Sequence, residues 1–153
     1  MTNPWEGEVE GWRVLGTGGQ NLDDICKYVD NDDRLGMMEA MCRWRCSAPT
    51  APDTLCKSPL PTLPAHFPST DSGDEVSNSK TGSYPFQDDE PFVMKECPHL
   101  YFVGCQSEFG TKIIEGPQGQ MVRLVLVPSF AATKEIVLID TETLDVSKVK
   151  ITA

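Results

Sequence analysis

The sequence lacks any apolar run that approaches the roughly 20 residues required by a membrane-spanning helix. Its first residues also lack the basic and apolar regions of a secretion signal. We therefore expect an intracellular chain with no membrane association. Its 153 residues suit one soluble globular domain, because a chain of this size buries about 70% of its unfolded surface.

Basic residues are scarce, since 13 Lys and Arg stand against 23 Asp and Glu, and the formal net charge is −10. Residues 1–33 carry eight acidic and two basic side chains, a net charge of −6, whereas residues 34–56 carry +1. Nonspecific affinity for nucleic acid comes from several Lys or Arg contacts with phosphates. The composition therefore predicts that any action on DNA is indirect or weak and depends on a partner.

Patterns that bind metal ions are also missing. The chain has two histidines, His66 and His99, and no Cys-x-x-Cys pair. Cys42 and Cys46 are one helical turn apart, but no second pair completes four ligands. We expect reduced, partly buried thiols at the six cysteines, which are Cys26, Cys42, Cys46, Cys56, Cys97 and Cys105.

A glycine-rich turn lies in the stretch VLGTGGQNLDDI, residues 14–25, and has the layout of a phosphate-binding loop. The dinucleotide motif needs a third glycine where Asn21 stands, and no Gly-Lys-Ser/Thr is present. Asp23 and Asp24 would repel a phosphate at the helix start. We interpret the stretch as a tight turn with a glycine at positive φ, followed by a helix with Asn21 as N-cap and Asp24 as its capping-box partner.

The first third of the chain combines strand and helix patterns. A strand is predicted over Val9–Leu15, and helices over Leu22–Val29 and Arg34–Arg45, the second capped by Asp32 or Asp33. The second helix carries a wide apolar surface, with Leu35, Met38 and Cys42 on one face and Met37, Met41 and Trp44 on the next. Such a surface is typical of a helix packed on a sheet rather than of a methionine-rich binding groove. The prolines predict that Ala48–Leu55 is extended.

Proline, serine and threonine dominate residues 57–83, which show no apolar periodicity. Four prolines remove backbone donors, and the polar second half offers little to bury, so this segment is predicted to be disordered. It could be a passive loop or a proline-rich recognition motif.

The last third is mainly strand. Strands are predicted over Leu100–Val103, Lys112–Ile114, Met121–Val127, Glu135–Asp140 and Lys148–Ile151, separated by Gly and Pro turn signals. Together with the first third, this pattern predicts a layered α/β or α+β domain.

Several ordered blocks carry a family resemblance: LGTGGQNLDDI, APTAPDTL, YPF, DEPFVMKECPHLYFVG and FGTKII, followed by VRLVLVPSFAAT. In this order they resemble the C-terminal part of the small B subunits of DNA polymerase delta, within the family of B subunits of DNA polymerases alpha, delta and epsilon. The resemblance covers nearly all of the chain outside residues 57–83. It implies one domain formed by residues 1–56 and 84–153, with a Pro/Ser-rich insertion that is either a retained intron or a lineage-specific loop.

The resemblance implies a partial calcineurin-like metallophosphoesterase β-sandwich with flanking helices. It also implies that the chain is a fragment, since the preceding barrel and the first half of the phosphoesterase domain have no counterpart in it. We therefore expect its sheet to expose edges and apolar faces.

Catalysis can be judged from the turn that supplies metal ligands in active phosphoesterases, Gly-His-x-His after a late strand. By resemblance this turn is Gly104, Cys105, Gln106 and Ser107, which contains no histidine. His99 stands before the strand and is expected to be a capping or packing residue. The resemblance thus implies an inactive fold with no catalytic residues, no bound metal and no cofactor.

The leading hypothesis is a noncatalytic accessory subunit of nuclear DNA polymerase delta. Its implied partners are the C-terminal domain of the catalytic subunit and a further regulatory subunit. One alternative is a metal-dependent phosphodiesterase or exonuclease, and another is an independent interaction module that uses its proline tract as a ligand. The sequence does not identify the partner interface, for which Trp44 and Phe109 are candidates.

Overall fold

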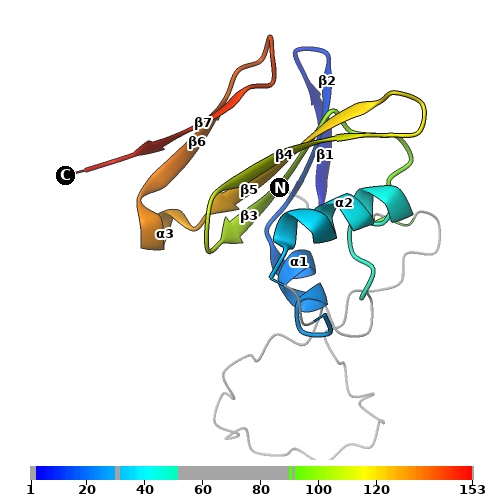
Figure 1. The fold of residues 1–153 in the computed structure, drawn as a ribbon, viewed down its shortest axis with the longest axis horizontal. Helices are drawn as coiled ribbons and strands as arrows, with labels where there is room; N and C mark the ends of the chain where they lie inside the picture. The colour runs from blue at the N-terminus through cyan, green and yellow to red at the C-terminus, as the bar shows by residue number, and fades with distance from the viewer. Residues whose placement is uncertain (1–2, 30–31, 52–89, 91, 153) are drawn as a thin grey trace, which may run out of the picture.

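The computed structural model describes residues 3–29, 32–51, 90 and 92–152 (Figure 1). The predicted insertion at 57–83 and its boundaries lie outside the described residues, as do His66 and Cys56. None of the described helices is long and apolar enough to cross a membrane.

The centre of the structure is a mixed five-stranded sheet with the order β1-β2-β3-β5-β4. Strands β2, β3 and β5 are parallel, while β1 and β4 pair antiparallel at the two edges. The five strands are β1 (Trp5–Val9), β2 (Trp12–Thr17), β3 (Leu100–Gln106), β4 (Gly110–Glu115) and β5 (Met121–Pro128). The predicted mixed α/β class is confirmed.

The N-terminal strand prediction was wrong in extent, because the chain forms a hairpin of β1 and β2 rather than one strand over Val9–Leu15. Glu10 and Gly11 connect the two strands with φ of 49° and 82°. Two central residues with positive φ define the tight hairpin turn whose twist matches that of the flanking strands. The sequence pattern had placed these turn residues inside a strand.

Helices α1 (Gln20–Ile25) and α2 (Arg34–Trp44) cover one face of the sheet (Figure 1). The N-cap prediction for α1 was wrong: Gly19 is the N-cap, with φ of 103°, and Asn21 lies inside the helix. The expected glycine with positive φ is therefore present. The α2 prediction is confirmed, since the Asp33 carboxylate accepts a hydrogen bond of 2.8 Å from the Gly36 N–H.

After α2 the chain turns instead of continuing as the predicted extended segment. Residues 49–51 form a turn in which the Ala51 N–H donates to the Ala48 carbonyl at 3.1 Å. Proline is favoured at the second position of such a turn, where Pro49 stands. Residues 52–55 of the predicted extended segment lie outside the described part of the chain.

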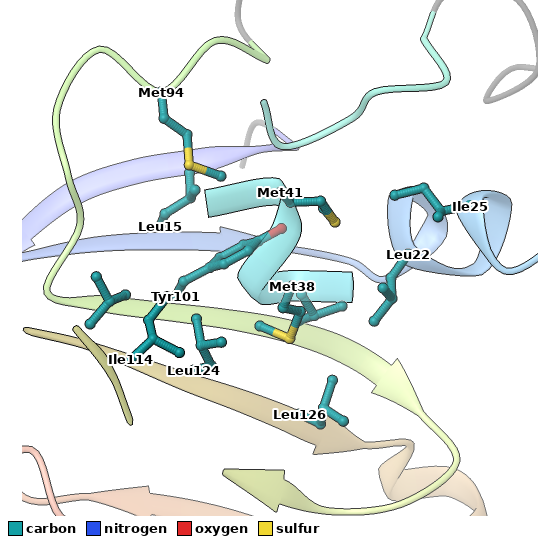
Figure 2. Close-up of a cluster of buried hydrophobic side chains, with 12 residues drawn as sticks. Leu15, Leu22, Ile25, Met38, Met41, Met94, Tyr101, Ile114, Leu124 and Leu126 are labelled. Atoms are coloured by element: carbon teal, nitrogen blue, oxygen red, sulfur yellow. The ribbon is translucent and has the colours of Figure 1, made fainter. Parts of the chain in front are cut away.

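The main hydrophobic core lies between the two helices and the sheet (Figure 2). Leu22, Met38, Met41, Tyr101 and Leu124 are fully buried in it. Met38 and Met41 project from α2 toward side chains of β3 and β5 (Figure 2). The methionines of α2 therefore fill a core, as the helix-on-sheet interpretation requires.

The second face of the sheet is covered in part by a hairpin of β6 (Glu135–Ile139) and β7 (Val146–Lys150), which follows the short helix α3 (Phe130–Thr133). Val137, Ile139 and Val146 of this hairpin pack toward the sheet. Helix α3 was not predicted, and the predicted strands of the last third differ from the observed bounds by up to two residues at the start and up to three at the end.

Other apolar side chains on this side of the molecule are exposed to solvent. The outer face of the hairpin exposes Ile136, Leu138, Val149 and Ile151 by 38–50%, and the sheet itself exposes Ile113 and Met121. Strands β1 and β4 also form the two edges of the sheet. The expectation of exposed edges and apolar faces is confirmed for the described residues.

Candidate functional site

The candidate site lies at the carboxyl ends of the parallel strands β2, β3 and β5, where open α/β sheets commonly bind ligands. The turn singled out by the family resemblance lies here, but its expected position after the strand was wrong. Gly104, Cys105 and Gln106 are the last residues of β3, and only Ser107 follows it.

A β-bulge at the end of β3 determines where these side chains point. The pairing with β5 shifts register between Val103 and Gln106, and Cys105 has φ of 54°. A bulge re-aims the side chains of its strand. As a result Cys105 is exposed, whereas Gln106 is 1% exposed.

The buried amide of Gln106 is held by hydrogen bonds on both sides. Its Nε2 donates to the Gly104 carbonyl at 2.9 Å, and its Oε1 accepts from Nη1 of Arg34 at 2.6 Å. Arg34 also donates to Asp23 at 2.7 Å, and this hydrogen bond raises the pKa of the Arg34 guanidinium above its ordinary value. The Arg34–Asp23 ion pair therefore lies beside the turn at the end of β3.

The residues at this site do not fit a metal pair. Oε1 of Gln106 already accepts a hydrogen bond from the Arg34 guanidinium, so a metal ion at this oxygen would have to displace that contact. Among the described residues no group of three or more His, Cys, Asp and Glu side chains could hold a metal ion. The described residues at these strand ends therefore do not supply the ligands of a metal pair.

The glycine-rich turn packs directly on the bulge of β3. A Cβ atom at Gly19 would lie 2.3 Å from the Gly104 carbonyl oxygen and 2.9 Å from Nε2 of Gln106. This contact requires glycine in addition to the positive φ. Close packing against β3 therefore accounts for the glycine at this position without a bound nucleotide.

Asn21 connects four segments beneath the site. It accepts from the Thr17 hydroxyl at 2.9 Å, donates to the Ser47 carbonyl at 2.5 Å and contacts the Tyr101 hydroxyl at 3.3 Å. Burial raises the pKa of Tyr101 well above its usual range, so its hydroxyl stays neutral. The sequence indicated a polar residue at a helix start, but the partners of Asn21 are set by tertiary structure.

His99 lies at the opposite end of β3 from the bulge. Its Nδ1 accepts from the Arg13 N–H at 3.0 Å, and its ring meets that of Trp12 edge-on at 5.2 Å. Its backbone bonds to Arg13 and Arg123 continue the pairing of the sheet. The prediction of a packing residue is confirmed, and His99 does not approach Gln106.

The five described cysteines are free thiols. Cys105 is exposed and the other four are partly buried, so the expectation of partly buried thiols was wrong for Cys105. Burial, together with the nearby Cys97 and Glu39, raises the pKa of Cys42 to about 12. Cys42 therefore remains protonated and poorly nucleophilic near neutral pH.

The two aromatic candidates for a partner interface differ in exposure. Trp44, the last residue of α2, is 61% exposed. Phe109 instead packs against the partly covered face of the sheet, and Nζ of Lys148 lies 5.7 Å from its ring centroid. Of the two, Trp44 alone presents most of its surface to solvent.

Comparisons with known proteins agree with the blocks that carry the resemblance. The family of DNA polymerase alpha/epsilon B subunits matches residues 1–111. The chain is 38% identical to the DNA polymerase delta small subunit of Arabidopsis thaliana over 94% of its length. It is 35% identical to the DNA polymerase delta small subunit of Oryza sativa subsp. japonica, and 33% identical to DNA polymerase delta subunit 2 of Drosophila melanogaster, each over 95% of its length.

These matches cover 27% of the Arabidopsis protein and 28% of each of the other two, so the chain spans little more than a quarter of the relatives' length. The matching region includes the glycine-rich turn, helices α1 and α2, and residues 104–107 at the end of β3. The chain belongs to the family of DNA polymerase alpha/epsilon B subunits.

Proposed function

We propose that the chain forms part of a noncatalytic accessory subunit of nuclear DNA polymerase delta. In this role it joins the C-terminal domain of the catalytic subunit to a further regulatory subunit during DNA replication. The similarity to small subunits of DNA polymerase delta over 94–95% of the chain is the observation that carries this proposal.

The same proposal includes the fold and its inactivity. Residues 1–56 and 84–153 belong to a calcineurin-like phosphoesterase domain, which the segment 57–83 interrupts. The Arg34–Gln106 hydrogen bond supports inactivity, because it puts a guanidinium where a metal-assisted hydrolase would need cations. The alternative of a phosphodiesterase or exonuclease gains no support from His99, which lies at the far end of β3.

Charge supports an indirect relation to DNA. The net charge is −10, and seven basic side chains of the described residues are engaged in ion pairs: Arg13, Lys27, Arg34, Arg43, Lys112, Arg123 and Lys148. Few unpaired cations therefore remain in the described part of the chain to replace the counterions of a phosphate backbone.

Copurification with the catalytic subunit tests this function. The chain, coexpressed with the C-terminal domain of the polymerase delta catalytic subunit from the same organism, should stay bound at about 1 M salt, where exposed charge pairs are screened. The corresponding domain of polymerase epsilon is the control. No retention of either domain, or equal retention of both, would contradict the proposal.

A further inference from the structure

A cavity of about 400 Å³ lies at the amino ends of the parallel strands, away from the candidate site at their carboxyl ends. Its lining comes from the start of β2, residues 97–99 before β3, strand β4, the start of β5 and the turn that joins β6 to β7. This volume falls within the roughly 300–1,000 Å³ that is typical of sites for small ligands. We call this site the amino-end cavity.

The β6–β7 turn forms one wall of the amino-end cavity, and two contacts hold it there. Nε1 of Trp12 donates to the Thr141 carbonyl at 2.6 Å, and Nη2 of Arg123 pairs with Asp145 at 3.1 Å. These contacts bring the turn beside the start of β2 (Figure 1). Because the wall is already in place in the free chain, a ligand would have to order little additional structure.

The charged side chains that line the amino-end cavity are cationic. Arg13 and Arg123 line it, and no Asp or Glu is among the described residues of the lining. Each arginine pairs through one nitrogen with a carboxylate outside the lining, that of Glu96 or Asp145. Since a guanidinium has five N–H donors, each arginine retains donors for a second acceptor.

His99 adds a further donor to this lining. Its Nδ1 accepts from the Arg13 N–H at 3.0 Å, so the ring proton lies on Nε2. Nε2 has no hydrogen-bond partner within the described part of the chain. Donors from two arginines and a histidine therefore line one cavity, which favours a ligand with acceptor atoms and negative charge.

The rest of the lining is mostly apolar. Ile113 and Met121 are exposed, Leu144 is partly buried, and the ring of Trp12 meets that of His99 edge-on. A ligand that covered these side chains would remove apolar surface from water. The lining therefore favours an anion with an apolar body over an inorganic anion.

We propose that the amino-end cavity binds a small organic carboxylate with an aromatic or apolar body. A planar carboxylate matches the fork of a guanidinium, and its single charge suits a chain whose net charge of −10 repels more highly charged ligands. The inference is independent of the proposed function, because it uses only the lining of the cavity.

NMR titration of the full chain with 1-naphthoate tests the proposal. We expect saturable binding with a dissociation constant below about 1 mM. The indole N–H signal of Trp12 should move, whereas those of Trp5 and Trp44 should not, because Trp12 alone of the three lines the cavity. The neutral analogue 1-naphthalenemethanol should bind at least about tenfold more weakly, since it has the same body without the charge.

Opposite charges introduced at Met121 provide a matched pair of variants. Met121 lines the cavity and is 53% exposed, so either charge is compatible with folding. Met121→Glu should weaken the binding of 1-naphthoate about tenfold, whereas Met121→Lys should leave it unchanged or strengthen it. The two variants should bind the neutral analogue equally.

Replacement of one lining arginine tests the source of the positive charge. Arg123→Met should weaken the binding of 1-naphthoate about tenfold, because it removes a cation from the cavity. Arg43→Met is the control, since Arg43 also pairs with a carboxylate but does not line this cavity. Its affinity should equal that of the unchanged chain.

Three results would overturn the proposal: no saturable shift of the Trp12 signal, equal affinity for 1-naphthoate and its neutral analogue, or equal effects of Met121→Glu and Met121→Lys. Tighter binding of 1-naphthyl phosphate than of 1-naphthoate would overturn the choice of a carboxylate.

Discussion

The two faces of the central sheet differ in how completely this chain covers them. On the helical face Leu22, Met38, Met41 and Tyr101 are fully buried. On the other face the β6–β7 hairpin covers only part of the sheet, and Met121 remains 53% exposed. The helical face therefore supplies most of the stability of the chain, whereas side chains on the outer surface of the hairpin contribute little to it.

The largest expected effect is at the centre of the helical face. Met38→Ala should lower the free energy of unfolding by about 3 kcal/mol, because it leaves a cavity among fully buried side chains. Urea unfolding measures this change. Val149→Ala, at a position 42% exposed on the hairpin, is the control and should cost less than about 0.5 kcal/mol. Equal losses of unfolding free energy in the two variants would show that the two faces do not differ in their contribution to stability.

A second prediction concerns the contact between the glycine-rich turn and the bulge of β3. Gly19→Ala should lower the free energy of unfolding by about 2 kcal/mol, because its Cβ would lie 2.3 Å from a carbonyl oxygen at φ of +103°. Gly11 has a similar φ of +82°, but a Cβ atom there would meet no atom within 4 Å. Gly11→Ala therefore measures the cost of the backbone conformation alone and should lower the free energy of unfolding by about 1 kcal/mol. Thermal melts of both variants check the order.

A smaller effect on stability is expected at Glu39, whose ion pair with Lys112 links α2 to β4. Hydrogen bonds from Lys112, and then from Arg43, hold the pKa of Glu39 below its ordinary value of 4.5. The stabilisation is therefore fully present above about pH 4.5 and is lost as the pH falls through the lower pKa of the folded state.

Glu39→Gln should lose this pH dependence, and at pH 7 it should destabilise the chain less than Gly19→Ala does. Urea unfolding of the unchanged chain and of Glu39→Gln between pH 3 and 7 measures this dependence. If the difference between their free energies of unfolding stayed constant over this range, the ion pairs of Glu39 would not contribute to stability.

The smallest expected effect is on the outer face of the hairpin. Leu138 is 50% exposed, so Leu138→Lys should change the free energy of unfolding by no more than about 0.5 kcal/mol. The added charge should also reduce self-association through exposed apolar side chains, which light scattering measures. A loss of about 2 kcal/mol or more would indicate that this face is packed in solution.

Local patterns in the sequence predicted the elements that depend on periodicity and caps. Helix α2 was found within one residue, and Asp33 is its cap where the sequence allowed Asp32 or Asp33, because its apolar residues and its capping group are close in sequence. The strands of the last third were located by their β-branched residues, although β3, β4 and β5 extend further than predicted. The missed β1 has only two apolar residues, Trp5 and Val9, of which Val9 is 45% exposed.

The arrangement of the candidate site could not be predicted in this way. The family resemblance drew attention to residues 104–107, but the hydrogen bond from Arg34 to Gln106 joins residues 72 positions apart. The bulge that exposes Cys105 and buries Gln106 depends on pairing with β5, which comes later in the chain. The sequence predicted Asn21 as a helix cap, because its actual partners, Ser47 and Tyr101, come close to it only in the folded chain.

We propose that the Arg34 guanidinium is structural at these strand ends and that the chain does not cleave phosphodiesters. Calorimetric titration of the full chain with Mn²⁺, paired with an assay of phosphodiester cleavage, tests this proposal. We expect no saturable binding and no turnover, with Arg34→Met equally inactive. Saturable binding of two Mn²⁺ ions per chain, accompanied by Mn²⁺-dependent cleavage, would contradict it.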